Sequence, residues 1–357
     1  MYDVNAHIHT PYSFSAFESI GQALDMALAD GVRVVGINDF YTGEGYVQWQ
    51  KGCEQRGLVP LYGIEFIALD LKDQAAGRRV NDPGNPGRTY ISGKGLRCPF
   101  TLPAKETSML ERVREASRRQ VQQMCGRLNA HLEASRAGIQ LDFNEIEATL
   151  TSGQVRERHL AKALRLAVKD SSVYGRILGG PMKADPQDAA AVEDELRSRL
   201  LKAGGAAFVP EDGEAFLPVE EVCGIIRAAG GIPTYPFLGD DAKGGFTDFE
   251  ADLKKAAKEL WSKGLRSVEF ISSRNTTAVL ERYARYLEDE GFIVPLGSEH
   301  NPPAMEPLRL RTRDHAELSD TLRAINWRGA CAIAAHQAGL EGVSSGEELI
   351  NNVISNG

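Results

Sequence analysis

The sequence predicts an α/β protein built around a parallel sheet or barrel. Over the first 70 residues, apolar and β-branched runs alternate with amphipathic helical patterns, and the connections between them are short. The same alternation returns after residue 215, whereas residues 100–215 show helical patterns only. We therefore expect a strand–helix fold that a helical insertion interrupts.

The first part of the chain, residues 1–99, shows the clearest alternation. Apolar side chains at helical spacing, followed by glycine, predict each helix, and β-branched runs that end in polar residues predict the strands. The expected strands lie at residues 2–9, 32–39 and 58–70, and the expected helices lie at 19–31 and 45–57. Residues 72–96 carry turn signals, with a further short strand at 88–92.

The second part, residues 100–215, is predicted to be helical. Apolar side chains from Leu110 to Leu132 mark one face of a long helix over residues 105–135, with Thr107 as its expected N-cap. Further helical patterns follow at 142–150 and 155–170. We interpret this part as an insertion because strand–helix alternation resumes after it.

The remaining chain divides into residues 216–301, which complete the strand–helix fold, and a helical tail at 302–357. In the former we expect helices at 218–231 and 275–291 and strands at 232–237, 265–272 and 292–300. In the tail we expect helices at 317–325 and 345–354.

Composition and charge narrow the class of protein. The chain is 42% hydrophobic and 25% charged, as in ordinary globular proteins. Its net charge of −8 argues against binding to extended nucleic acid. Five scattered cysteines without a CxxC pair indicate reduced thiols. We find no signal peptide and no apolar run near the roughly 20 residues of a membrane span, so we expect a soluble cytoplasmic protein.

Polar side chains stand at the ends of the expected strands, where α/β proteins place their active sites. They are His7 and His9, Asp39, Glu65, and the later pair Glu299 and His300. His7 and His9 lie two residues apart and therefore point to the same side of a strand. Imidazoles and carboxylates that converge in this way suit Mn, Zn or Fe better than Ca or Mg.

Simpler interpretations of the same residues stay open. Histidines at a strand end can pack or bind water without holding a metal. Glu65, in the apolar segment “YGIEFIALD”, needs a partner if it is buried, and a nearby arginine would serve as well as a metal. Asp39 could cap the turn that follows it.

Taken in order, the motifs resemble those of the PHP family, named for polymerase and histidinol phosphatase. The matching segments are “HIHTPYS”, “GVRVVGINDFYT”, “YGIEFIAL”, “AAGGIPTYPF”, “SVEFISSRN” and “PLGSEHN”. The resemblance covers residues 1–96 and about 216–301 and implies a distorted (β/α)7 TIM-like barrel with metals at the strand ends. The helical region containing “VRERHLAKAL” is similar to the insertion of PHP phosphoesterases and exonucleases that act on nucleotides.

The resemblance also implies a reduced metal centre. The family holds one metal with an HxH pair, a glutamate and an aspartate, and the matching positions here are His7, His9, Glu65 and Glu299. This set is complete, with Glu299 in place of aspartate. We therefore expect one divalent transition metal ion, Mn, Zn or Fe, in each chain.

The positions that match the family's other two metals are altered. Histidines of the second metal correspond to Tyr90 and Tyr235, and phenols are poor ligands near neutral pH. Ligands of the third metal correspond to Phe14 or Ser15, to Phe40 and to His300, and only His300 could still bind an ion.

We therefore expect a metal-dependent phosphoesterase that hydrolyses a small phosphate ester or nucleotide. Side chains would replace the missing cations as phosphate ligands, and the candidates are Arg88, Lys94, Arg156, Arg158, His159 and Arg274. Tyr235 or His300 could donate a proton to the leaving oxygen, and Asp39 could orient a histidine.

Two other classes of function remain. The altered positions also suit a catalytically inactive PHP-fold protein that binds a ligand or a partner. Another metal-dependent barrel hydrolase, such as an amidohydrolase, fits less well because it generally needs more histidines on later strands, and here His131 and His159 fall in helical segments.

Overall fold

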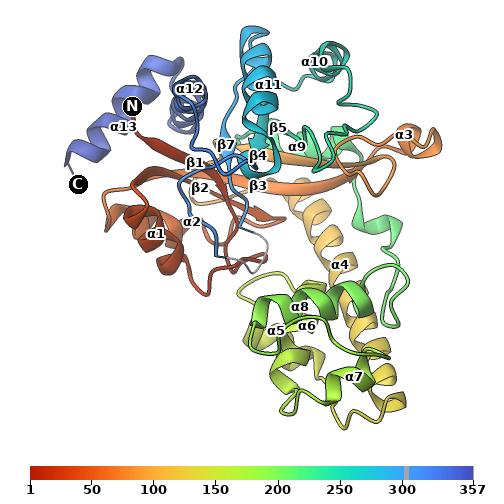
Figure 1. Ribbon diagram of the computed structural model, residues 1–357. Coiled ribbons are helices and arrows are strands. Elements are labelled where there is room, and N and C mark those ends of the chain that lie inside the picture. The colour runs from red at the N-terminus through yellow and green to blue at the C-terminus, as the bar shows by residue number, and fades with distance from the viewer. Residues whose placement is uncertain (301–304, 357) are drawn as a thin grey trace.

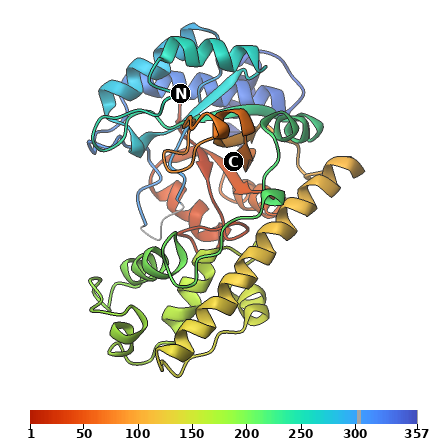
Figure 2. The ribbon, with the colours of Figure 1, turned by 90° about the vertical axis from the view of Figure 1, so that its right-hand side faces the viewer.

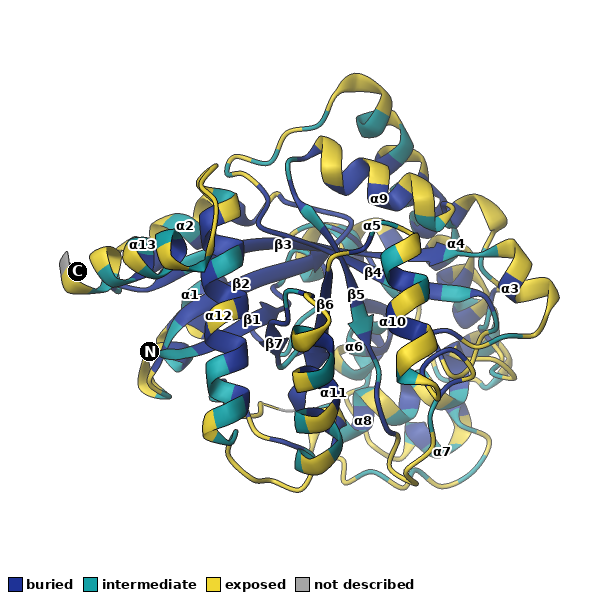
Figure 3. Ribbon diagram, turned by 90° about the horizontal axis from the view of Figure 1, so that it is seen from above, coloured by how far each residue is buried: buried dark blue, intermediate teal, exposed yellow. Residues whose placement is uncertain are grey.

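The computed structural model describes residues 1–300 and 305–356 and confirms the expected fold class. A seven-stranded sheet curls into a nearly closed barrel, and helices flank it (Figures 1 and 3). The expected start of the helical tail, at residue 302, lies outside the described residues, and the expected division of the chain into four segments stays a prediction.

The strands follow one another around the barrel in sequence order. Their bounds are β1 Asp3–Ile8, β2 Val32–Phe40, β3 Val59–Leu69, β4 Arg88–Lys94, β5 Ile232–Phe237, β6 Ser267–Ile271 and β7 Leu296–Gly297. Just beyond β7, the backbone of Glu299 donates to the His7 carbonyl and accepts from the His9 amide, both at 2.9 Å. These two bonds join the last strand to the first.

Most neighbouring strands run parallel, as expected, but β4 runs antiparallel to both β3 and β5. The connection from β3 to β4 contains only the short helix α3 Leu71–Ala75 and turns. A parallel return would need a crossover helix long enough to pass back along the sheet. The strand β4 therefore departs from the parallel arrangement that the sequence predicted for the sheet or barrel.

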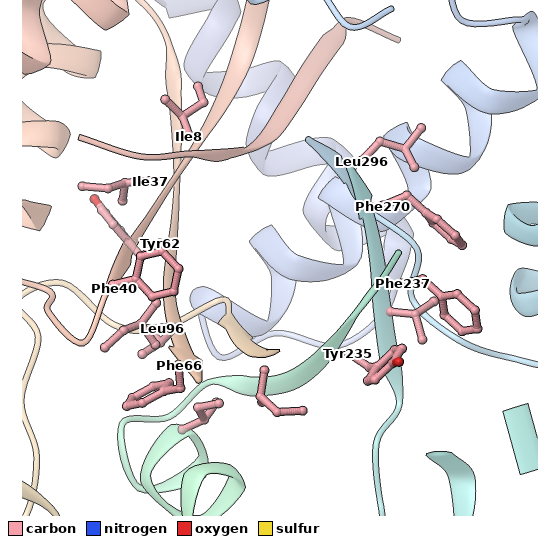
Figure 4. Packing of buried hydrophobic residues seen from close by; sticks show 14 of the residues in the cluster. Ile8, Ile37, Phe40, Tyr62, Phe66, Leu96, Tyr235, Phe237, Phe270 and Leu296 are labelled. Carbon is pink, nitrogen blue, oxygen red and sulfur yellow. The ribbon is translucent and has the colours of Figure 1, made fainter. Parts of the chain in front are cut away.

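Helices cover the outside of the barrel with their apolar faces inward and their polar faces exposed (Figure 3). These helices are α1 Ile20–Ala29, α2 Tyr46–Glu54, α9 Val219–Ala228, α10 Leu253–Ser262 and α11 Thr277–Asp289. The layer between strands and helices is apolar, and Figure 4 shows part of it, including Ile37, Phe66 and Phe270. The sequence analysis did not anticipate α10.

The inserted helices form a second body with an apolar cluster of its own, which runs from Val121 to Val209. Its elements are α4 Ala104–Ala134, α5 Phe143–Leu150, α6 Glu157–Ala167, α7 Val173–Ile177, α8 Ala189–Leu196 and the single turns Arg197–Leu201 and Gly213–Ala215. Helix α4 leads away from the barrel and carries the others along its far half (Figure 2). It begins at Ala104, so Thr107 is not its N-cap.

Two C-terminal helices, α12 Asp320–Gln337 and α13 Val343–Asn356, pack on each other beside the first strands (Figure 1). They share a small apolar cluster with Val4, Val34 and Leu61. No helix among the described residues is long and apolar enough to cross a membrane.

The inside of the barrel is polar rather than apolar. Strand alternation turns His7 of β1, Asn38 of β2, Lys94 of β4 and Glu269 of β6 into one hydrogen-bonded group, and each is at most 2% exposed. A barrel interior usually holds branched apolar side chains. This polar filling is what places charged groups beneath the ends of the strands.

The seam between β7 and β1 leaves no room for a side chain at Gly297. A Cβ atom there would lie 2.3 Å from the Cβ of His7. We expect Gly297→Ala to lower the free energy of unfolding by about 1–3 kcal/mol, measured by urea denaturation. In Gly224→Ala, on exposed helix α9, the new Cβ meets no atom within 4 Å, so stability should hold or rise. Equal stability of Gly297→Ala and wild type would contradict this close packing.

Candidate metal centre

Three buried side chains converge where β1 ends, beside the middle of β3. Nε2 of His7 lies 3.3 Å from Nε2 of His9, and Oε2 of Glu65 lies 3.6 Å and 3.2 Å from these two nitrogens. All three residues are at most 3% exposed. Among the described residues this is the group of histidine, cysteine and acidic side chains whose spacing could hold a metal ion.

The spacing of these donors fits a metal ion. Zinc binds imidazole nitrogen and carboxylate oxygen at about 2.0–2.2 Å in tetrahedral geometry, so two ligand atoms lie about 3.3–3.5 Å apart. The three observed separations bracket this value. In addition, Oε2 of Glu65 is buried without a hydrogen bond of acceptable geometry. A cation would satisfy this oxygen, and the donor set therefore fits a divalent ion.

The outer nitrogens of both imidazoles have partners. Nδ1 of His7 lies 3.0 Å from Oε2 of Glu269, and Nδ1 of His9 lies 3.4 Å from Oγ of Ser13. Ser13 in turn donates to Asp39 at 2.7 Å. Such outer contacts orient histidine ligands in metal sites. Both rings therefore present Nε2 to the centre.

Strong charges act on this cluster. Burial alone would lower the pKa of His7, but the carboxylates of Glu269 and Glu65 raise it to about 9. Burial alone would raise the pKa of Glu65, but the adjacent imidazoles of His7 and His9 lower it to about 2. Without a metal, the cluster therefore holds an imidazolium beside a carboxylate at neutral pH.

A cavity of about 1140 Å³ opens above this cluster, between the barrel and the inserted helices. His7 and Glu65 lie in its wall, and aromatic side chains such as Phe14 and Tyr90 line it further. Its basic side chains are Arg88, Arg156, Arg158, Arg197, Lys202 and Arg274. The same wall carries acidic side chains, among them Glu157, Glu211 and Glu299, so the charge that a ligand would meet depends on which basic groups these carboxylates pair with.

Two of these arginines lack an acidic partner. The guanidinium of Arg156 lies 5.2 Å from the ring centre of Phe40. The guanidinium of Arg158 lies 4.7 Å from the ring centre of Phe14. Within the described ranges, neither has a carboxylate at ion-pair distance. Arg88, by contrast, pairs with Glu211, and Arg274 pairs with Glu299 at 2.6 Å. Arg156 and Arg158 are thus available to a bound anion.

Glu299 lies in the cavity wall but outside the three-residue cluster. Its carboxylate is held by Arg274, while its backbone, with a φ of 71°, joins β7 to β1 between His7 and His9. The structure therefore brings three of the four expected ligands together and places the fourth against an arginine.

Tyr235, His159 and Lys94 are expected site residues that do not line the cavity. The Tyr235 hydroxyl donates to Glu250 at 2.8 Å, because strand alternation turns Tyr235 to the outside of the barrel. Nδ1 of His159 accepts from the backbone of Arg156 and caps helix α6. Lys94 points into the barrel, where its ammonium meets Glu269 at 2.7 Å.

His300 and Asp39 have structural contacts. The two nitrogens of His300 contact Ser298 and the carbonyl of Glu306 at 2.6 and 2.8 Å. Asp39 accepts from the backbone of Thr10 and from Ser13, both at 2.7 Å, and so fixes the loop after β1. Asp39 is thus connected to His9 through Ser13, and its role in orienting this histidine stays a prediction.

An aromatic residue occupies a place that the resemblance assigns to a metal ligand. The ring of Phe40 stacks on His9 with a 5.1 Å separation of centres and contacts Arg156. Tyr90 lies in the cavity wall with its phenol pKa raised by burial, so it stays protonated at neutral pH. Neither position supplies a ligand for a further divalent ion.

Glu269 is the main residue of the site that sequence reasoning missed. Its signal was the same as that of Glu65, a single carboxylate in an apolar strand, here “SVEFIS”. A buried carboxylate needs a partner, and two such carboxylates on different strands of one barrel can share one. Its actual partners, His7 and Lys94, became visible only with the register of β1, β4 and β6.

Comparison with known proteins supports the fold. No family model matches the chain, and no curated protein sequence matches it. An amidohydrolase structure from Chromobacterium violaceum, with bound sulfate and no metal, aligns with a TM-score of 0.59 and 18% identity over 90% of this chain and 93% of its own. A protein from Bifidobacterium adolescentis, provisionally named a metal-dependent phosphoesterase, aligns with a TM-score of 0.58 and 20% identity. This alignment covers 90% of this chain and 94% of the other. The chain is therefore similar in fold to hydrolases of these two descriptions.

Ion binding at the cluster should release a proton. His7, with a pKa of about 9, is protonated near pH 7 when no ion is bound, and a bound ion takes the place of that proton. We expect about one proton released per ion, and an apparent affinity that rises about tenfold per pH unit up to about pH 9. Calorimetry in buffers of different ionisation enthalpy measures both quantities. Ion binding without proton release would show that His7 is neutral in the metal-free protein.

The buried His159 should make the protein sensitive to acid. Burial lowers its pKa from 6.5 to about 4, so its contribution to stability is complete above pH 6.5 and is lost as the pH falls towards 4. The loss should reach about 3 kcal/mol. His159→Asn keeps an acceptor for the Arg156 amide but cannot titrate, so its stability should change less over this range.

Urea denaturation at several pH values measures the acid effect of His159. The matched control is His315→Asn, which removes an exposed histidine at a φ of 60° that asparagine tolerates. This control should keep the wild-type dependence on pH. If His159→Asn loses as much stability in acid as the wild type, the acid sensitivity comes from another group.

Proposed function

We propose that this chain is a PHP-family phosphoesterase that hydrolyses a small phosphate ester or nucleotide at a single divalent metal ion. The observation that carries the proposal is the convergence of His7, His9 and Glu65 at tetrahedral spacing beneath an arginine-lined cavity. The similarity in fold to a provisionally named metal-dependent phosphoesterase agrees with it.

The donor set indicates Mn, Zn or Fe, because two imidazoles and one carboxylate suit a transition metal. Bound there, the ion would supply an activated water and a positive charge opposite a phosphate oxygen. We propose one ion per chain, because Phe40 and Tyr90 stand where the family resemblance places ligands of further ions. Glu299 would complete the set if its carboxylate left Arg274.

The arginines of the cavity would bind the phosphate. Arg156 and Arg158 have no acidic partner, and each guanidinium can form paired hydrogen bonds with phosphate oxygens. Arg274 lies beside them in the same wall. The sulfate of the Chromobacterium violaceum structure has the shape and charge of the phosphate that we propose here.

Proton donation to the leaving oxygen falls to a different tyrosine from the one expected. Tyr235 is occupied by Glu250 outside the cavity, whereas Tyr90 lies in the cavity wall. Burial raises the pKa of the Tyr90 phenol, so the group carries its proton at neutral pH, and a strongly basic leaving oxygen would be needed to take that proton. We therefore assign this role to Tyr90.

A cytoplasmic location suits the five unpaired cysteines.

A second candidate function is that of a binding protein without catalysis. The charges of the buried cluster balance without a metal, because the cations His7 and Lys94 face the anions Glu65 and Glu269. In that case the cavity would bind an anionic ligand through its arginines and release it unchanged. Metal content and turnover distinguish the two functions.

The decisive experiment combines elemental analysis with hydrolysis of an aryl phosphate in the presence of Mn²⁺. We expect one bound ion per chain in the wild type. His7→Ala and Glu65→Gln should bind no ion, and their turnover should fall by more than about 100-fold. The exposed His315→Ala is the matched control and should keep both. If the wild-type protein shows neither a bound ion nor turnover, the phosphoesterase proposal is wrong and the binding protein without catalysis is the remaining candidate.

A further inference from the structure

We infer that Lys94 and Glu269 form a buried positioning pair that holds His7 in the tautomer and orientation needed to bind the metal ion. This inference rests on the metal site of the proposed function. It concerns a layer of residues below that site, inside the barrel, which the cavity does not reach. Neither residue would contact the substrate.

Lys94 is committed to the barrel interior. Its ammonium contacts the Ala6 carbonyl at 3.0 Å, Oδ1 of Asn38 at 2.9 Å and Oε2 of Glu269 at 2.7 Å. An ammonium has three protons, so these acceptors use its full capacity. The residue is 2% exposed. Lys94 therefore has no free donor for a phosphate and acts on its neighbours instead.

Glu269 connects Lys94 to His7, one of the proposed metal ligands. Its Oε2 atom receives both Lys94 and Nδ1 of His7, while its Oε1 atom has no hydrogen-bond partner. The three residues come from β4, β6 and β1, so the pair ties three strands together inside the barrel. Because Lys94 fixes the position of Oε2, the place where Nδ1 of His7 must donate is fixed as well.

The contact with Glu269 determines which nitrogen of His7 faces the ion. A carboxylate accepts a proton but cannot donate one, so Nδ1 carries hydrogen and Nε2 is left as the metal-binding atom. Asn38, which Lys94 holds by its oxygen, places its nitrogen 3.1 Å from Nε2 and 3.4 Å from Nδ1. This amide packs along the ring and restrains its rotation.

Lys94 also offsets the unfavourable burial of the Glu269 carboxylate. A buried carboxylate without a countercharge is strongly unfavourable. The Lys94 ammonium provides a countercharge 2.7 Å from Oε2 of Glu269, inside the barrel and apart from the metal ligands. The lysine therefore acts on the ion through Glu269 and His7, and not by direct contact.

Replacement of the pair by apolar residues separates positioning from a purely structural role. Lys94→Met leaves the buried Glu269 carboxylate with His7 as its one remaining ion partner, and Glu269→Leu leaves the buried Lys94 ammonium with no carboxylate at ion-pair distance among the described residues. Both variants should lower the midpoint of urea unfolding. The double variant removes both charges and should recover most of that midpoint. Its His7 ring, however, has lost the acceptor at Nδ1.

The readout is binding of Co²⁺ to the full chain, followed by its visible absorption and by competition with a chelator. We expect Co²⁺ affinity to be about 10- to 100-fold weaker in Glu269→Leu and in the double variant, with a changed absorption band. The exposed Lys258→Met is the matched control and should bind as the wild type does.

The outcomes are distinguishable. A double variant that recovers both the unfolding midpoint and the Co²⁺ affinity would overturn the positioning role and leave the proposed metal site intact. A wild type that binds no Co²⁺, Mn²⁺ or Zn²⁺ would overturn the metal site itself and this inference with it. Recovered stability with weakened affinity and an altered band would support the inference.

Discussion

The seam between β7 and β1 is the constraint on which the rest of the structure depends. The backbone of Glu299 pairs with His7 and His9 on either side of Ile8, and Gly297 lets the two strands approach closely. This pairing closes the barrel at the point where both imidazoles leave β1. Their convergence with Glu65, from β3, follows from closure, because an open sheet would leave the ends of these strands further apart.

The polar interior is compatible with a stable fold because its charges are paired. His7, Glu65, Lys94 and Glu269 come from four strands, and each is almost fully removed from water. Burial of any one of them alone would be strongly unfavourable, whereas together they satisfy one another. Such a network favours one strand register over its neighbours, since a shift by one residue would turn each charge towards the apolar outer layer.

Much of this arrangement could be predicted from the sequence. Two-residue spacing placed His7 and His9 on one side of β1, and the isolated carboxylate in an apolar strand marked Glu65. What could not be predicted depends on neighbours in space. The direction of β4 follows from its connection, Tyr235 turns outward because Thr234 and Pro236 take the inward positions of β5, and Lys94 meets Glu269 only across the barrel. The sequence pattern likewise does not show which polar side chains line the cavity and which lie inside the barrel.

The inserted helices have an apolar cluster that is separate from that of the barrel, yet they contribute Arg156 and Arg158 to the cavity. The ion-binding atoms, in contrast, belong entirely to the barrel. In the proposed function, chemistry and selectivity would thus be encoded in different stretches of the chain. If the proposed function holds, replacement of the inserted helices would change the ligand that is bound without altering the metal-binding atoms.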